Sequence, residues 1–419
     1  MIQTKLDINF DRLKSDILTL GEIGRTDGDD RGIYRQAFTD ADMQARDWLK
    51  NRIIEAKMEC DQDGAANIIG RVNPQPDVPV ISIGSHIDTV PAAGMLDGSL
   101  GVLVGLECLR RIREENIQTE FPLELVAFTD EEGRFGGLFG SQSMVGEVTL
   151  ERIQTAADLE GNLLKDVMAG HGLDAVDALR ARRGKGAIKA YLELHIEQGP
   201  VLDQSPDHNV GVVTHITGLF KWAVRLIGAA DHAGTTPMPM RKDALMGLAE
   251  FAYEIQRILD ENGGPNSVAT IGRAALFPGT ANTVPGRVDF SIDCRDTDPG
   301  VLDALGDAFQ RALSAIARRR GLMFEYDVLS EVAPVPCDPD IVDVLRKHAT
   351  ERGMNFMELP SGAAHDAQIM ARIAPVGMIF VPSIDGRSHS PAEWSHWEDI
   401  ETGANLTLSA LLELAKVKS

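Results

Sequence analysis

A histidine and two aspartates follow an apolar run early in the chain, and their types suit a metal site. His86 and Asp88 come directly after residues 78–83, and Asp97 lies in a glycine-containing loop ahead of the apolar stretch 100–112. A neutral His86 could bind a metal ion, Asp88 could fix its tautomer, and Asp97 could bridge two ions. The alternative is a strand-end histidine with two turn aspartates that only cap the following helix.

Three more segments end in residues of the same kinds. The acids 130–132 close the apolar run 123–128, and three adjacent carboxylates repel one another unless a cation or solvent compensates. His195 lies in an apolar strand-like segment, and His389 follows the apolar run 376–381. Taken singly, these features also fit a solvated acidic loop or a core histidine.

Taken together, these residues predict a site with two divalent metal ions, zinc or manganese, because imidazoles and carboxylates suit such ions. The candidate ligands are His86, Asp97, Glu132, His195 and His389. We expect Glu131 to point away from its neighbour Glu132 and so to be free as a general base. Metal ions lower the pKa of water that they bind, and a nearby carboxylate can pass the proton of that water to a leaving nitrogen. The sequence therefore predicts hydrolysis by metal-activated water.

Residues after position 215 offer groups that could contact a substrate. Asn282 lies in a turn-rich loop where its amide can face a ligand, and Arg295 ends a strand where it could clamp a carboxylate. His232, among glycines and threonines, could polarise a carbonyl oxygen. The alternatives are a salt bridge from Arg295 to Asp293 or Asp296, and a solvent-exposed loop position for His232.

The order of strand-like and helix-like segments predicts an α/β protein whose catalytic domain has a central mixed sheet flanked by helices. This domain is discontinuous, covering 1–215 and 332–419, with an inserted four-stranded α+β domain at 216–331. Its expected strands are 67–72, 78–83, 123–128, a segment within 190–200, 210–216 and 375–382, and its helices 8–20, 38–58, 100–115, 340–353, 365–372 and 398–417. The insertion's strands are expected at 221–228, 268–276, 286–295 and 322–330, with helices at 241–261 and 299–320.

Composition limits the class of partner. The chain has 419 residues, 43% hydrophobic and 25% charged, with a formal net charge of −22. Such a charge disfavours nucleic acid and anionic membranes as partners but permits a small anionic substrate held by a local arginine. Four widely spaced cysteines and no signal-peptide pattern favour the cytoplasm.

The motifs taken together resemble the N-carbamoyl-L-amino-acid hydrolase and allantoate amidohydrolase group of dinuclear metallohydrolases, within the aminoacylase and carboxypeptidase superfamily. The matching stretches, which span most of the chain, are GSHIDTVPAAGMLDGSLGVL (84–103), FTDEEGRFGGLFGS (128–141), ELHIEQGPVL (193–202), DHAGTTPM (231–238), PGTANTVPGRVDFSIDCRD (278–296), SGAAHDAQ (361–368) and FVPSIDGRSHSPAE (380–393). Ala364 departs from the pattern, since many members have glycine there, and its methyl group is expected to crowd the substrate pocket.

The resemblance implies a role for each matching residue. His86, Asp97 and His195 would hold one metal ion, and Asp97, Glu132 and His389 the other. Glu131 would be the general base, with Asp88 orienting His86. The residues implied to meet the substrate are Gln198, His232, Asn282, Arg295 and His365, with Arg295 taking an α-carboxylate. The insertion would be a lid that forms a homodimer, with His232 serving the neighbouring subunit.

The resulting hypothesis is an amidohydrolase that cleaves a linear carbon–nitrogen bond, other than a peptide bond, in an N-carbamoyl or ureido group of a small carboxylate. An N-carbamoyl-L-amino acid or allantoate would be such a substrate. An aminoacylase or dipeptidase that acts on an N-acyl amino acid with the same metal pair is the alternative. A non-catalytic binding protein is a third reading, but binding alone gives no reason for a free base such as Glu131 beside the ligands.

Overall fold

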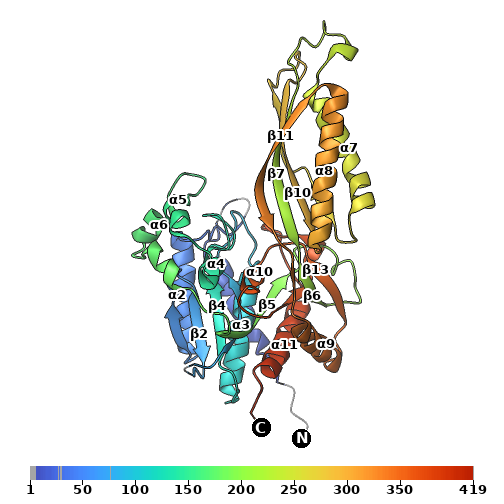
Figure 1. Cartoon of the computed structure of the whole chain (residues 1–419). Helices are drawn as coiled ribbons and strands as arrows, with labels where there is room; N and C mark the ends of the chain where they lie inside the picture. Colours follow the sequence, from blue (N-terminus) through green and yellow to red (C-terminus); the bar gives the residue numbers. More distant parts are fainter. Residues whose placement is uncertain (1–5, 27, 29–30, 76, 419) are drawn as a thin grey trace. The chain divides into compact units, whose positions relative to one another are not determined.

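A computed structural model describes residues 6–26, 28, 31–75 and 77–418 (Figure 1). Within these residues, no helix is long and apolar enough to cross a membrane. The chain divides into two compact units, one formed by Met1–Thr214 and Cys337–Ser419 and the other by His215–Pro336.

A nine-stranded mixed sheet organises the first unit. Its strand order is β1-β2-β4-β3-β5-β14-β6-β12, with β13 also paired to β6. The strands are β1 (Glu59–Gln62), β2 (Ile68–Val72), β3 (Val80–His86), β4 (Leu123–Phe128), β5 (Ile188–Ile196), β6 (Val210–Ile216), β12 (Val335–Pro336), β13 (Phe356–Ser361) and β14 (Val376–Val381). The four central strands, β4, β3, β5 and β14, are parallel to one another. Their carboxyl ends therefore lie at one edge of the sheet.

Helices flank this sheet, as expected for strands buried on both faces. They are α1 (Phe10–Glu22), α2 (Asp40–Glu55), α3 (Ser99–Glu114), α4 (Phe139–Val145), α5 (Leu150–Thr155), α6 (Leu164–Gly170), α9 (Pro339–Glu351), α10 (Asp366–Met370) and α11 (Trp397–Leu414), with short 3₁₀ turns η1 (Ala175–Arg180) and η3 (Ile384–Gly386). Helix α3 contacts β3, β4 and β5 on one side and α1 and α11 on the other. It is therefore buried on nearly all sides, and its first turn is held close to the sheet edge. The prediction of a mixed α/β fold is confirmed.

The second unit is an α+β sandwich of one sheet and two long helices (Figure 1). Its strands are β7 (Gly218–Ile227), β8 (Val268–Thr270), β9 (Ala274–Phe277), β10 (Arg287–Asp296) and β11 (Met323–Val332), in the order β11-β7-β10-β8, with β9 also on β10. The helices α7 (Ala244–Asn262) and α8 (Pro299–Arg320) pack with the sheet around one apolar core, and η2 is Met238–Met240. Alternate residues of β10 are buried, so its other face carries polar side chains such as Asp293 and Arg295.

Two expectations about strands were wrong. The insertion has five strands, because the single strand expected at 268–276 is interrupted around Gly272 into β8 and β9, which both pair with β10. In the first unit, the sequence pattern also missed β1 and β13. β1 is only four residues long and contains two acids, so it lacks the apolar signal of a central strand.

Candidate metal centre

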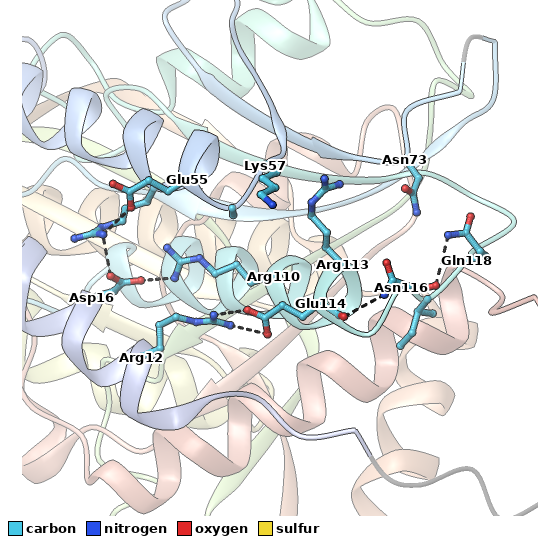
Figure 2. Close-up of a pocket in the computed structure, with 13 residues that line it drawn as sticks. Arg12, Asp16, Glu55, Lys57, Asn73, Arg110, Arg113, Glu114, Asn116 and Gln118 are labelled. Atoms are coloured by element: carbon cyan, nitrogen blue, oxygen red, sulfur yellow. Dashed lines mark hydrogen bonds and ion pairs between the residues drawn. The ribbon is translucent and has the colours of Figure 1, made fainter.

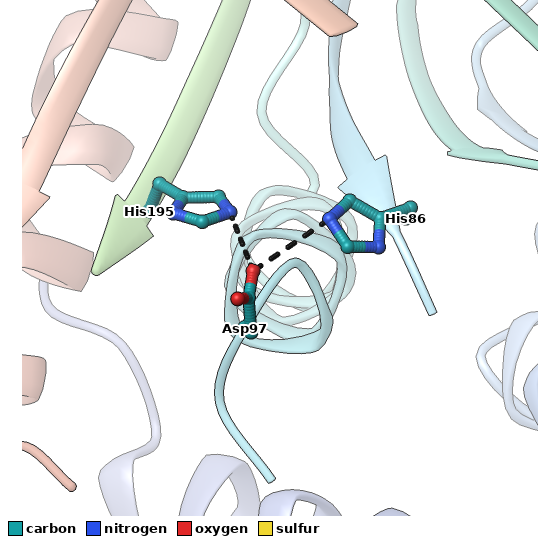
Figure 3. Close-up of side chains that lie close together, drawn as sticks. All are labelled: His86, Asp97 and His195. Carbon is teal, nitrogen blue, oxygen red and sulfur yellow. Dashed lines mark ion pairs between the residues drawn. The ribbon is translucent and has the colours of Figure 1, made fainter. Parts of the chain in front are cut away.

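Two strand-end histidines converge on Asp97 at the carboxyl edge of the parallel strands (Figure 3). His86 is the last residue of β3, and His195 is the penultimate residue of β5. Asp97 lies in the loop that leads into α3. Its Oδ1 is 3.8 Å from His86 Nε2 and 3.2 Å from His195 Nε2. All three side chains are buried.

Hydrogen bonds from the Nδ1 atoms of His86 and His195 fix how these two rings face Asp97. His86 Nδ1 donates to the backbone carbonyl of Asp88 at 3.0 Å, and His195 Nδ1 donates to that of Ile196 at 2.9 Å. In a neutral imidazole the other nitrogen, Nε2, then carries a lone pair. Both Nε2 atoms face the carboxylate of Asp97, and His195 Nε2 also lies 3.2 Å from the backbone nitrogen of Gly98. A proton or a metal ion between ring and carboxylate would stabilise this arrangement.

The second oxygen of Asp97 faces a different group. Oδ2 lies 3.2 Å from His389 Nε2, and His389 Nε2 lies 3.6 Å from Glu132 Oε2. His389 follows β14 and has a left-handed backbone, with φ of 53°. Asp97 therefore stands between two groups of possible ligands, His86 with His195 and Glu132 with His389, each with atoms within 4.8 Å of one another.

Glu131 and Glu132 both point into this site, so the prediction that they alternate in direction was wrong. Ligand atoms of His86, Glu131 and Glu132 also lie within 4.8 Å of one another, with Glu131 Oε2 3.6 Å from His86 Nε2. The reason is that β4 ends at Phe128 and the chain then turns through Asp130, whose φ is 53°. The alternation of an extended strand does not continue through such a turn.

Asp88 contacts His86 most closely through its backbone, because its carbonyl accepts the Nδ1–H of His86 at 3.0 Å while its carboxylate Oδ1 lies 3.9 Å from the same nitrogen. The carboxylate also accepts the backbone N–H groups of Glu131 at 3.3 Å and Glu132 at 3.2 Å. That the Asp88 side chain orients His86 stays a prediction. Asp88 thus links the β3 end to the acidic loop after β4.

The electrostatics of the site favour an added cation. Burial, followed by repulsion from Glu132, raises the pKa of Glu131 well above its ordinary value. Burial and then Asp97 raise the pKa of Glu132 in the same way. Burial opposes ionisation of Asp97, yet hydrogen bonds with His195 and His389 keep its pKa well below the ordinary value. Crowded buried carboxylates of this kind need a compensating positive charge.

The residues present fit a pair of divalent ions. Besides the ring nitrogens that face Asp97, Glu132 Oε1 is buried without a hydrogen-bond partner. Imidazole nitrogens with carboxylate oxygens are the donors that zinc and manganese accept. The chain therefore has candidate metal-binding groups, built from the five residues that the sequence predicted as ligands.

Two further predicted residues lie beside these ligands. Gln198, which also has a left-handed backbone, donates from Nε2 to Asp97 Oδ2 at 2.8 Å. His365 is buried behind His195, with ring centroids 4.6 Å apart and Nε2 2.8 Å from Ser361 Oγ. Burial and the neighbouring His195 hold the pKa of His365 well below its ordinary value, so this ring is neutral. The adjacent Ala364 is exposed.

His232 and Asn282 lie together in the second unit. His232 is bridged to Thr283, and the backbone N–H of Ala233 donates to the carbonyl of Asn282 at 2.9 Å. His232 Nδ1 accepts the N–H groups of Gly234 at 3.0 Å and Thr235 at 3.2 Å, which leaves Nε2 as the donor nitrogen. Both predicted side chains are exposed.

Arg295 lies at the opposite end of the same sheet. The His232 and Asn282 loops meet near the start of β10, where Gly228 N–H donates to the carbonyl of Gly286 at 2.7 Å, whereas Arg295 is near the end of β10. At about 3.3 Å per residue the two ends are roughly 26 Å apart. Arg295 makes the salt bridge that the sequence left as its alternative, with Nε 2.9 Å from Asp293 Oδ1.

Glu393, which no sequence pattern singled out, holds the Asp97 loop. Its Oε1 accepts the backbone N–H groups of Leu96 and Asp97, each at 3.0 Å. The only sequence signal was its place four residues after His389 in Ser-His-Ser-Pro-Ala-Glu.

A separate cavity of about 570 Å³ lies at the other end of α3 from Asp97 (Figure 2). Its charged side chains largely pair among themselves: Arg12 with Glu114, and Arg110 with Asp16. Among the described residues, none of the grouped metal-ligand candidates lines this cavity.

This fold, with grouped histidines and acids at the strand ends, is that of a family of hydrolases. Residues 82–413 match peptidase family M20/M25/M40, and the chain belongs to this family. The resemblance seen in the sequence is thereby confirmed.

Relatives in this family match nearly the whole chain. It is 39% identical over 413 residues to N-carbamoyl-L-amino acid amidohydrolase of Geobacillus stearothermophilus, covering 98% of this chain and 99% of that one. It is 34% identical over 388 residues to allantoate amidohydrolase of Escherichia coli K12, covering 92% and 93%. The crystal structure of an amidase of the hydantoinase/carbamoylase family from Burkholderia multivorans has a TM-score of 0.89 and 34% identity, covering 98% of each chain.

Proposed function

We propose that this chain is a dinuclear metal-dependent amidohydrolase that cleaves a carbon–nitrogen bond in the ureido group of a small carboxylate, such as an N-carbamoyl-L-amino acid or allantoate. The observation that carries this proposal is Asp97, whose two oxygens face two different groups of histidine and carboxylate ligands. The N-carbamoyl-L-amino acid and allantoate amidohydrolases among its relatives support the choice of bond.

In this proposal His86, Asp97 and His195 hold one ion, and Asp97, Glu132 and His389 hold the other. Two zinc or manganese ions would supply Lewis acidity and lower the pKa of bound water. Glu131 accepts the proton of the attacking water at a carboxylate oxygen and returns it to the leaving nitrogen. Its raised pKa when no cation is present fits a group that can carry this proton.

Substrate contacts come from both units. Gln198 already lies against Asp97, and His365 lies behind His195. Arg295 would bind the substrate carboxylate through two parallel N–H donors, a task for which its guanidinium is suited. His232 Nε2 and the Asn282 amide would donate to the ureido oxygen, where negative charge develops. The products are ammonia, carbon dioxide and an amino acid, or a ureido acid from allantoate.

We further propose that the second unit is a lid and that it forms a homodimer. Because His232 and Arg295 lie at opposite ends of one sheet, a single small substrate is too short to reach both from one copy of this unit. A dimer in which His232 and Asn282 of one protomer serve the other's site resolves this. Mixing the His232→Ala and Arg295→Ala proteins should restore activity, because one site of the mixed dimer then has both residues. If each protomer used only its own residues, the mixture would stay inactive.

The test of the proposed reaction is a substrate panel built on one amino acid. N-carbamoyl, N-acetyl and dipeptide forms are compared on one preparation whose metal content is measured. The proposal predicts that the N-carbamoyl form, or allantoate, is hydrolysed fastest. Preference for the N-acetyl form or the dipeptide would instead establish an aminoacylase or a dipeptidase.

The four cysteines are free, and we place the protein in the reducing cytoplasm.

A further inference from the structure

A buried carboxylate joins the two loops that carry the proposed bridging ligand and the last ligand. Glu393, 3% exposed, accepts the backbone N–H groups of Leu96 and Asp97 through Oε1. Its Oε2 lies 3.2 Å from Ser388 Oγ, which in turn lies 3.0 Å from Asp97 Oδ2. One side chain therefore connects the Asp97 loop to the segment that contains His389.

Glu393 packs closely against Gly94. A Cβ at Gly94 would lie 2.5 Å from Glu393 Cβ and 2.6 Å from its Oε1. Any larger residue at position 94 would push the carboxylate out of its place. The close approach of these two loops therefore depends on glycine at position 94.

The two groups of metal-ligand candidates differ in what holds them. His86 and His195 belong to central strands and donate from Nδ1 to backbone carbonyls. His389 is on an irregular segment, its side chain is 51% exposed, and its backbone is left-handed. The sheet thus fixes the first group, whereas the second depends on contacts between loops.

We propose that Glu393 is a positioning residue that sets the spacing between Asp97 and His389, and so determines how tightly the second metal ion is held. This inference rests on the proposed dinuclear function. Glu393 would not touch the ion: its hydrogen bonds aim Asp97 Oδ2, through the backbone of Asp97 and through Ser388, at His389. Residues that hold a metal ligand by hydrogen bonds typically contribute about 10- to 100-fold to the metal affinity of a site.

The test is a metal titration of the stripped full-length chain. Calorimetry with Mn²⁺ or Zn²⁺ should give two ions per chain for the unaltered protein. Glu393→Ala should keep the first ion and bind the second about 10- to 100-fold more weakly. Glu393→Gln retains an oxygen that can accept both N–H groups, so it should bind both ions nearly as the unaltered protein does.

A matched control separates this role from general stability. Glu107 is also a buried glutamate that joins two segments, because its Oε1 accepts the backbone N–H of Asn9 at 2.9 Å and its Oε2 accepts Nε–H of Arg12 at 2.7 Å. Neither segment carries a candidate ligand next to these contacts, so Glu107→Ala should bind two ions. Equal weakening in both alanine variants would overturn the proposal, as would Glu393→Gln behaving like Glu393→Ala.

The failure of this inference can be told from failure of the proposed function. Two ions in the unaltered protein and two equally tight ions in Glu393→Ala would overturn only the role of Glu393. Fewer than two ions in the unaltered protein would overturn the dinuclear site and this inference together.

Discussion

Removing metal should make the stability of the first unit depend on pH, and His195 sets the magnitude. Burial opposes its protonation, but the hydrogen bond to Asp97 and the negative charges of Asp97 and Glu193 together outweigh this and raise its pKa from the ordinary 6.5 to about 9. A raised pKa stabilises the fold fully below pH 6.5, and this contribution is lost as the pH rises through about 9. At about 1.36 kcal/mol per pH unit, the difference corresponds to roughly 3 kcal/mol. The raised pKa values of Glu131 and Glu132 act in the same direction.

Urea unfolding with excess chelator, followed by tryptophan fluorescence, measures this. Three tryptophans lie in the first unit and Trp222 in the second, so a Trp222→Phe background reports the first unit alone. The free energy of unfolding should fall by roughly 3 kcal/mol between pH 6.5 and pH 9, and saturating Zn²⁺ or Mn²⁺ should remove most of that slope. His195→Gln in chelator should make the slope smaller, leaving the contribution of Glu131 and Glu132. Equal stability at both pH values in chelator, or the same slope with metal, would refute the reasoning.

Three substitutions test individual residues. Glu131→Gln should lower turnover by about 10²- to 10⁴-fold, the usual contribution of a general base. Elemental analysis should show unchanged metal content. Near-normal turnover would show that another group moves the proton. Gly98→Ala would place a Cβ 2.3 Å from the His86 ring. Calorimetry should therefore show weaker binding of the ion that His86 holds. Unchanged affinity would mean that the loop can move to make room for the methyl group. Arg295→Lys should raise KM by about 10- to 100-fold, because losing one hydrogen bond to a charged group costs about 1.5–3 kcal/mol; an unchanged KM would remove Arg295 from the substrate site.

The strand-end ligands could be predicted from the sequence because parallel topology brings distant residues to one edge. Once the apolar runs before His86, His195 and His389 are interpreted as neighbouring strands, the carboxyl ends of those strands must meet. These features depend on local periodicity and on general rules of topology.

Features set by turns and by contacts distant in sequence could not be predicted in this way. The shared direction of Glu131 and Glu132 follows from one left-handed residue, Asp130, which no periodic pattern reveals. Glu393 acts on Asp97 across 296 positions, and only packed loops bring the two together. The separation of His232 from Arg295 depends on which end of β10 each loop joins, and this is determined by strand register rather than by residue type.

The most direct test of the central claim is a titration of the metal-stripped protein with Zn²⁺ or Mn²⁺ while ammonia release from an N-carbamoyl-L-amino acid or allantoate is measured. We expect no ammonia release without metal and full release at two ions per chain. Full activity in verified metal-free protein would contradict this claim.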